Sequence, residues 1–284
     1  MKRFLLISML FMTFLLLEGN AFAKKTEVEK FILNHNKALK EHNLEELSSC
    51  YDKNFVSVDG VNLDEMIKML DSTKKTFKTM DYSIKSIVLD ENEELATVYM
   101  KEKTKATINP TRKGDKKGKL EGLSKYIVNL KKENGAWKIV SDKVLSEETT
   151  IKYGVARKSD IELVVPSYIT NGEEYDISLK VENLKNLFAL GSISKEEISP
   201  NVGEYKEKFR RIPQEGELER VVRANEKNRN EYAMASVGFT KVTINQEKTK
   251  AKIRVLGVGY VIKRINMLEE KKEELAMEKK NVKG

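Results

Sequence analysis

Few side chains in this chain are suited to nucleophilic or metal chemistry. It has two histidines, His35 and His42, and one cysteine, Cys50. The histidines lie seven residues apart in a predicted helix, two turns along one face, and we place that face in solvent. The sequence has no histidine or cysteine spacing typical of zinc, no G-x-S-x-G motif and no glycine-rich phosphate loop. It therefore predicts no metal and no cofactor, and Cys50 is expected to pack as a small hydrophobe, which leaves carboxylates and tyrosines for acid–base chemistry.

The elements that would position such groups are helices followed by strands. Apolar residues from Thr26 to Lys75 recur at helical spacing, interrupted by a short predicted strand, FVSVDG, over 55–60. Four β-rich runs follow between Phe77 and Thr149, separated by turn signals such as Glu133-Asn134-Gly135. This order indicates an α+β domain whose helices cover one face of a curved antiparallel sheet.

Residues 26–149 resemble the nuclear transport factor 2-like (SnoaL-like) family. The resemblance lies in "NHNKALKEHNLEELSSCYDKNFVSVDG", a helix pair that leads into a Tyr-Asp-x-Asn-Phe segment, and in "GAWKIVSD", the end of the last strand. It implies a cone of three helices packed into a strongly bent sheet, with Trp137 closing the sheet over the helices. It also implies a homodimer through the open sheet face, unless the rest of the chain covers that face.

Enzymes of this family place an Asp or His with a Tyr inside the cone. The alternative, catalytic interpretation therefore uses Asp59 or Asp142 as base and a tyrosine such as Tyr99 as acid, as in an isomerase or dehydratase. Many members carry histidines at positions occupied here by Ser141 and Lys143. We favour the interpretation in which no residue is catalytic and the tyrosines fill the curved sheet. The candidates for lining a ligand pocket are Tyr51, Phe55, Tyr82, Tyr99, Tyr126 and Trp137.

The second half of the chain reads as strands. About seven short β-rich runs between residues 153 and 267 predict an all-β sandwich, and "VVPSYITNGEEYDISLKVEN" resembles the opening strands of bacterial Ig-like surface modules. The expected organisation is a signal peptide over 1–23, a nuclear transport factor 2-like domain over 24–152, the Ig-like β-sandwich over 153–267 and a charged tail over 268–284. The first domain is expected to fold alone.

The N-terminus predicts export. Basic residues, an apolar run from Phe4 to Leu17 and the small-residue site Ala21-Phe22-Ala23 form a secretory signal peptide, with cleavage after Ala23 and no stable membrane insertion afterwards. A single cysteine excludes an internal disulfide. The formal net charge of +8 is diluted by 44 acidic residues, so we expect no nucleic-acid partner.

Together these features predict an exported, periplasmic or secreted protein of the bacterial envelope that binds rather than catalyses. Its expected partner is a small apolar ligand held in the cone, or an envelope protein. The alternative is the isomerase- or dehydratase-like enzyme.

Overall fold

The computed structural model describes residues 25–77, 79–109, 117–182, 187–199, 208–244 and 251–269. The predicted signal peptide and nearly all of the predicted charged tail lie outside these residues. The α-helices are α2 (Glu27–Glu41), α3 (Leu44–Ser49) and α4 (Leu63–Thr76). The strands are β1 (Asp81–Glu91), β2 (Leu95–Ile108), β3 (Gly118–Glu133), β4 (Ala136–Gly154), β5 (Ile161–Val164), β6 (Tyr168–Thr170), β7 (Glu174–Val181), β8 (Phe188–Glu197), β9 (Arg210–Arg211), β10 (Glu217–Arg223), β11 (Glu231–Ile244) and β12 (Ala251–Leu268), with the 3₁₀-helix η1 (Val155–Lys158) after β4.

Capping residues fix where the two longer helices begin. Thr26 accepts a hydrogen bond from the Glu29 amide, and Glu29 accepts one from the Thr26 amide, which is a capping box. Asn62 and Glu65 repeat the arrangement at the start of α4. Each such cap contributes about 1 kcal/mol. The predicted helices are therefore present, and their first residues follow from local sequence.

The segment between α3 and α4 differs from the prediction. Residues 55–60, expected to form a strand, make turns, with single bridges at Tyr51 and Val56. Gly60 closes the second turn at a φ of 81°, a left-handed conformation that favours glycine. The amide of Val58 donates to the carbonyl of Asp142, so this loop, which carries Asp59, is tied to β4.

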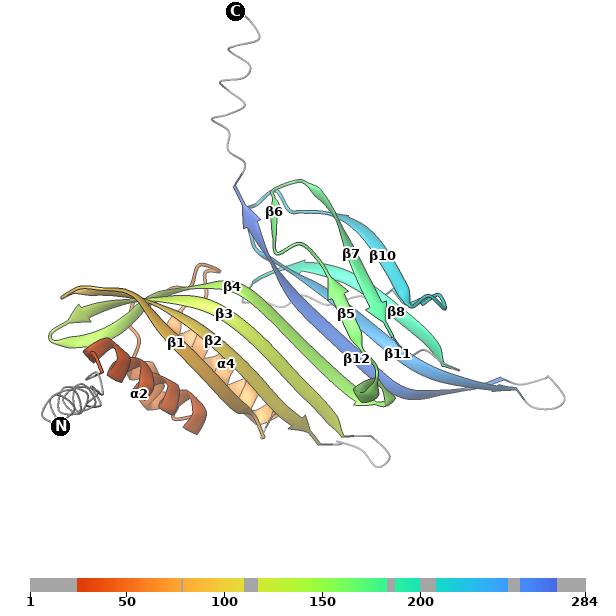
Figure 1. Cartoon of the computed structure of the whole chain (residues 1–284), viewed down its shortest axis with the longest axis horizontal. Coiled ribbons are helices and arrows are strands. Elements are labelled where there is room, and N and C mark those ends of the chain that lie inside the picture. Colours follow the sequence, from red (N-terminus) through yellow and green to blue (C-terminus); the bar gives the residue numbers. More distant parts are fainter. Residues whose placement is uncertain are drawn as a thin grey trace, which may run out of the picture.

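One antiparallel sheet runs through both halves of the chain. Its order is β1-β2-β3-β4-β12-β11-β8-β9, and the short strand β6 pairs with β12 in parallel (Figure 1). The last residues of β4, Glu148 to Gly154, pair with Lys263 to Gly257 of β12. The boundary expected at residue 152 thus lies within β4, and the sheet crosses it. The sequence could not show that β4 pairs with β12, because the alternation of apolar and polar residues along a strand does not depend on which strand it pairs with.

The two halves of this sheet are covered on opposite faces. On β3, Leu130 and Leu120 share the face that the helices cover, and Leu120 is opposite Ile151 of β4. The neighbouring residue Thr150 therefore faces the other way, and it is opposite Val261, which lies in the second core. Helices α2 and α4 lie on one side and the small sheet β10-β7-β5 on the other (Figure 1).

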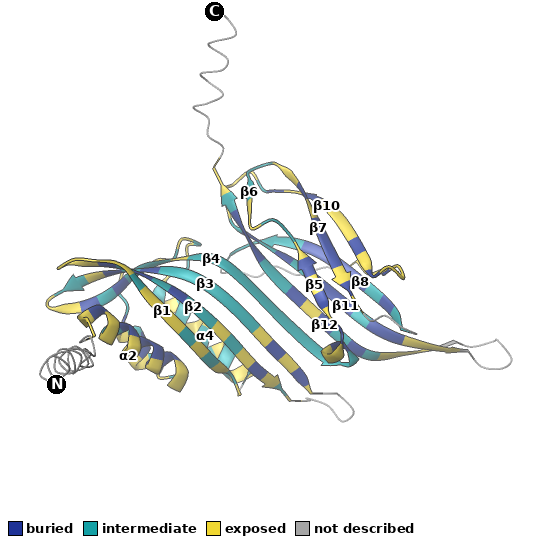
Figure 2. Ribbon diagram, in the orientation of Figure 1, coloured by how far each residue is buried: buried dark blue, intermediate teal, exposed yellow. Residues whose placement is uncertain are grey.

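The buried residues form separate cores in the two halves. In the first half, Val28 and Ile32 of α2 pack against Val98, Leu130 and Ile139 of the sheet. In the second half, β7 and β10 pack against the β8-β11-β12 part of the long sheet. Buried and exposed positions alternate along the strands, as expected for sheets covered on one face (Figure 2). A sandwich is therefore present, but one of its layers is the same sheet that lines the cone, and an immunoglobulin-like arrangement is not shown.

Within the described ranges, no helix is long and apolar enough to span a membrane.

Candidate functional site

Glu102 of β2, Tyr126 of β3 and Asp142 of β4 form the polar part of the face that the helices cover. The register aligns Met100 with Tyr126 and Val128 with Asp142, and both Met100 and Val128 lie in the first core. Opposed residues of neighbouring strands share a face, so Tyr126 and Asp142 point to the cone interior. Glu102 lies two residues beyond Met100 and points the same way.

Glu102 and Tyr126 are hydrogen-bonded to each other. The Tyr126 hydroxyl donates to Glu102 Oε2 at 3.3 Å, and Thr104 Oγ1 donates to Glu102 Oε1 at 3.0 Å. Burial raises the pKa of Glu102, and these two hydroxyls oppose the rise only in part. Burial, together with the Glu102 charge, also holds the pKa of Tyr126 well above its usual value. The phenol is therefore a neutral donor whose hydrogen bond is already in use.

His35 is buried in the cone, which corrects the prediction that it faces solvent. Its Nε2 lies 3.0 Å from the Tyr51 hydroxyl and its side chain is 3% exposed. Burial lowers the pKa of His35, so the ring is neutral at pH 7. The signal was present in the sequence, because His35 continues the i, i+4, i+7 stripe that Val28 and Ile32 begin. His42 follows the last residue of α2 as its left-handed cap, at a φ of 56°.

Asp142 differs from its neighbours because its carboxylate has no hydrogen-bond partner among the described residues. Burial and the negative charge of Asp59 raise its pKa to about 6, while the charge of Arg264 opposes the rise. A carboxylate that titrates near 6 exchanges protons readily at neutral pH, as a general base must. Of the two predicted bases, Asp142 is thus the one whose carboxylate has no hydrogen bond or ion pair with the described residues.

Replacing Asp142 with asparagine is expected to raise the free energy of unfolding by about 2–3 kcal/mol at pH 8 and to change it little at pH 4. The folded-state pKa is above that of the unfolded chain, so the folded state holds this proton more tightly. The stability that this provides is present at low pH and is lost as the pH rises through about 6. Urea denaturation from pH 4 to pH 8 measures the effect.

The matched control is Asp81→Asn, on an exposed position of β1. A constant difference between Asp142→Asn and the parent at every pH would contradict the assignment of this titration to Asp142.

Asp59, the other predicted base, forms an ion pair with Arg264. Arg264 of β12 donates through two nitrogens to the two Asp59 oxygens, both at 2.7 Å, and the side chains are 1% and 10% exposed for Arg264 and Asp59. Asn230 Nδ2 also donates to Asp59 Oδ1, at 2.8 Å. Burial by itself would raise the pKa of Asp59, but the hydrogen bonds and charge of Arg264, with Asn230, hold it below its usual value. Asp59 is therefore an ionised anchor between the two halves of the chain.

Further polar contacts join the halves near this ion pair. The Tyr232 hydroxyl of β11 donates to Glu147 of β4 at 2.7 Å, and Lys263 pairs with Glu148 at 3.2 Å. Asn266 accepts from Arg264 Nε at 2.8 Å and donates to the Leu145 carbonyl, also at 2.8 Å. These contacts fix β12 against β4 where the cone meets the sandwich.

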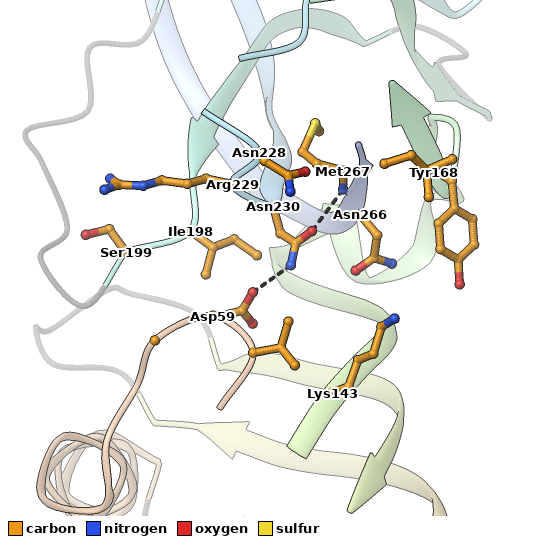
Figure 3. A pocket seen from close by; sticks show the side chains of 13 residues that line it. Asp59, Lys143, Tyr168, Ile198, Ser199, Asn228, Arg229, Asn230, Asn266 and Met267 are labelled. Atoms are coloured by element: carbon orange, nitrogen blue, oxygen red, sulfur yellow. Dashed lines mark hydrogen bonds between the residues drawn. The ribbon is translucent and has the colours of Figure 1, made fainter. Parts of the chain in front are cut away.

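A cleft of about 530 Å³ opens at this junction. The loop 58–60 and Lys143 of β4 form one wall, and residues 198–199, 228–230, 266–268 and Tyr168 form the other (Figure 3). Asp59 of the first wall accepts a hydrogen bond from Asn230 of the second wall, so the two walls are joined there. The volume is within the range of small-molecule sites.

The structure places the other predicted residues in different surroundings. Phe55 is 1% exposed and forms part of the first core, where it contacts Tyr51 edge-on. Tyr82 packs against the cluster around Leu47 and Leu39, and Trp137 lies in the first core. Tyr99 alternates with Val98 and Met100, so it occupies the face opposite the helices. Tyr99 is therefore not brought together with Asp142.

Sequence reasoning missed Glu102, Arg264 and Asn230, and it also did not name the cleft residues Lys143 and Tyr168 as candidates. Glu102 could have been found, because it continues the apolar face of β2 at the period of two residues. Arg264 and Asn230 carry no local signal, since their partner Asp59 is 205 and 171 residues away. In the part of the chain that the structure describes, no group of three or more His, Cys, Asp or Glu side chains is placed to hold a metal ion.

No family model and no curated protein matches this chain. Similar solved structures include the Kfla4162 protein from Kribbella flavida, with 12% identity and a TM-score of 0.36 over 42% of this chain and 86% of that one. A proposed dehydratase of the NTF2-like (nuclear transport factor 2-like) family from Streptomyces avermitilis has 15% identity and a TM-score of 0.35 over 42% of this chain and 92% of that one. AclR, a proposed hydroxylase from Streptomyces galilaeus, has 18% identity and a TM-score of 0.31 over 40% and 86%.

These proteins thus include a member of the family that the sequence resembles. At this identity and these TM-scores, the similarities carry no information on activity, substrate or partner.

Proposed function

We propose that this chain, a nuclear transport factor 2-like cone joined to an immunoglobulin-like sandwich, is an exported, non-catalytic binding protein of the bacterial envelope. Its ligand is small and binds in the cleft where the two halves meet. The observation that carries the proposal is that Asp59 and Asn230 of the cleft, here called its floor, are held by hydrogen bonds, while one lysine of the cleft has no partner among the described residues. Lys143 makes no hydrogen bond or ion pair with any residue that the structure describes, although it lines the cleft.

The rigidity of the floor follows from its hydrogen bonds. Asp59 accepts from Arg264 and from Asn230, and Asn230 in turn accepts from the amide of Met267 at 2.9 Å. A site whose walls are held before the ligand arrives loses less entropy on binding. Among the described lining residues there is no imidazole, and the one carboxylate, Asp59, is held in its ion pair, so the cleft offers neither of these two kinds of general base.

A tryptophan that fills the cleft tests this proposal. Val58 is 59% exposed and lines the cleft, whereas Val56, two residues earlier in the same loop, is 48% exposed and lies outside it. In a thermal-shift screen of chemically diverse small molecules, compounds that stabilise the parent are expected to lose their effect in Val58→Trp and to keep it in Val56→Trp. Compounds that stabilise all three proteins equally would show that the site is elsewhere.

A second candidate function is the acid–base enzyme, and the state of Asp142 favours it. This carboxylate has no hydrogen-bond partner among the described residues, its pKa is raised to about 6, and its charge helps to raise the pKa values of Tyr51 and Tyr126. Proton abstraction next to a carbonyl, the first step of an isomerisation or dehydration, would then use Asp142 as base and Tyr51 as acid, since the Tyr126 hydroxyl already donates to Glu102.

Deuterium exchange distinguishes the enzyme from the binding protein. A panel of cyclic ketones is incubated with the protein in D₂O, and loss of the α-proton signal is followed by NMR. The enzyme predicts exchange that Asp142→Asn reduces by about 100-fold or more and that Asp81→Asn leaves unchanged. Absence of protein-dependent exchange across the panel would count against Asp142 as a base.

A further inference from the structure

Most of the polar side chains around the cleft are already bound within the protein. Asn230 donates to Asp59 and accepts from the Met267 amide, so both ends of its amide are in use. Asn266 likewise accepts from Arg264 and donates to the Leu145 carbonyl. A hydroxyl-rich ligand such as a neutral sugar depends on amides of this kind for paired hydrogen bonds. The side-chain amides of Asn230 and Asn266 therefore have few hydrogen bonds left to make with such a ligand.

Two lining residues have a polar side chain without a partner among the described residues, one a cation and the other a phenol. Lys143 and Tyr168 lie at the same end of the cleft, and Tyr168 is 47% exposed (Figure 3). The hydroxyl of Tyr168, like the ammonium of Lys143, has no partner among the described residues. Arg229 lies towards the other end, where its guanidinium is 3.5 Å from Glu197. Donors with an excess of positive charge favour an anionic group on the ligand.

The rest of the cleft wall is apolar. Val58 and Ile198 lie on opposite walls, and Met267 and Leu268 follow Asn266 at the end of β12. Together with the exposed ring of Tyr168, these side chains can remove an apolar or aromatic group from water, which is the main source of affinity for a small ligand.

We propose, on the basis of the proposed function, that the ligand class is a small organic carboxylate with an apolar or aromatic body. Its carboxylate accepts hydrogen bonds from Lys143 Nζ and from the Tyr168 hydroxyl, while its body lies against Val58 and Ile198. A cationic ligand would find no uncommitted carboxylate, because the charge of Asp59 is neutralised by Arg264.

Isothermal titration calorimetry of the mature full-length protein tests this assignment. The probes are benzoate and hexanoate, the uncharged benzamide, the cationic benzylamine and the acidic sugar galacturonate. Benzoate and hexanoate are expected to bind, and benzamide to bind at least about 10-fold more weakly, because it lacks the charge that Lys143 recognises. Galacturonate has the carboxylate but no apolar body, and it is expected to bind more weakly than benzoate.

Two variants separate the role of Lys143 from an effect of general surface charge. Lys143→Gln is expected to weaken benzoate binding by about 10- to 100-fold, the range for a hydrogen bond to a charged group. The matched control Lys103→Gln removes another exposed lysine, on β2 and outside the cleft, and should leave the affinity unchanged. Lys143→Arg is expected to restore most of the affinity.

The outcomes distinguish the ligand class from the proposed function. Tighter binding of benzamide or benzylamine than of benzoate, blocked by Val58→Trp, would overturn the carboxylate assignment while keeping the cleft as the site. Tighter binding of galacturonate than of benzoate, blocked in the same way, would keep the carboxylate and overturn the apolar or aromatic body. Benzoate binding that Lys143→Gln and Val58→Trp both leave intact would overturn the cleft itself. Absence of binding by every probe would overturn the ligand class, and the wider screen with Val58→Trp and Val56→Trp would then decide whether the cleft binds anything.

Discussion

Replacing Arg264 with methionine is expected to lower the free energy of unfolding by about 3–5 kcal/mol at pH 7. The substitution leaves the Asp59 carboxylate buried without the two hydrogen bonds that it now accepts. An ionised carboxylate in that position must either stay unpaired or take up a proton, and both cost free energy. The effect is expected to shrink in acid, because the stabilisation from a carboxylate of lowered pKa is lost as the pH falls through that pKa. Guanidinium denaturation at pH 7 and pH 3 measures both expectations.

Two controls make the Arg264 result specific. Arg157→Met removes an exposed arginine of η1 and is expected to change stability by less than about 0.5 kcal/mol. The double variant Asp59→Leu/Arg264→Met replaces both charges by apolar groups and should recover much of the loss, since it leaves no unpaired charge. If the double variant were as unstable as the sum of the two single variants, the pair would not be the source of the effect.

Replacing Trp137 with alanine is expected to destabilise the protein by about 3–5 kcal/mol, the usual cost of deleting a large buried aromatic. Trp137 is 7% exposed and packs in the first core, and the ammonium of Lys132 lies 5.6 Å from its ring. It is the only tryptophan of the chain, so its emission reports this core alone. Denaturation followed by circular dichroism measures the loss in the variant.

Trp137→Phe, which keeps an aromatic ring in the core, is the matched comparison and should lose less stability than the alanine variant. Because Trp137 is not among the residues that line the cleft, ligands that bind there should leave the emission of the parent unchanged. Near-parental stability of Trp137→Ala, together with a saturable emission shift on adding ligand, would move the binding site into the cone.

The sequence by itself determined the helices and the long strands of the first half, but not the turns at residues 55–60. The capping pairs Thr26 with Glu29 and Asn62 with Glu65, and the apolar spacing along α2, are local signals within one or two helical turns. The order of helices and strands indicated an α+β arrangement, and the turn Asn134-Gly135 placed Trp137 at the start of β4. Each of these features depends on neighbours in the chain, so the printed residues suffice to predict it.

Only the tertiary structure decided how the elements of the two halves combine. The pairing of β4 with β12 joins the halves into one sheet. The alternation of apolar and polar residues along β4 does not predict this pairing, because an edge strand with no second neighbour can have the same alternation. The state of each candidate base depends on the same pairing. Strand β12 brings Arg264 to Asp59, which forms an ion pair with it, while the Asp142 carboxylate on the adjacent strand has no hydrogen-bond partner among the described residues. A pKa and a cleft are set by burial and by charges that fold into place from distant positions, and no local pattern of residues contains that information.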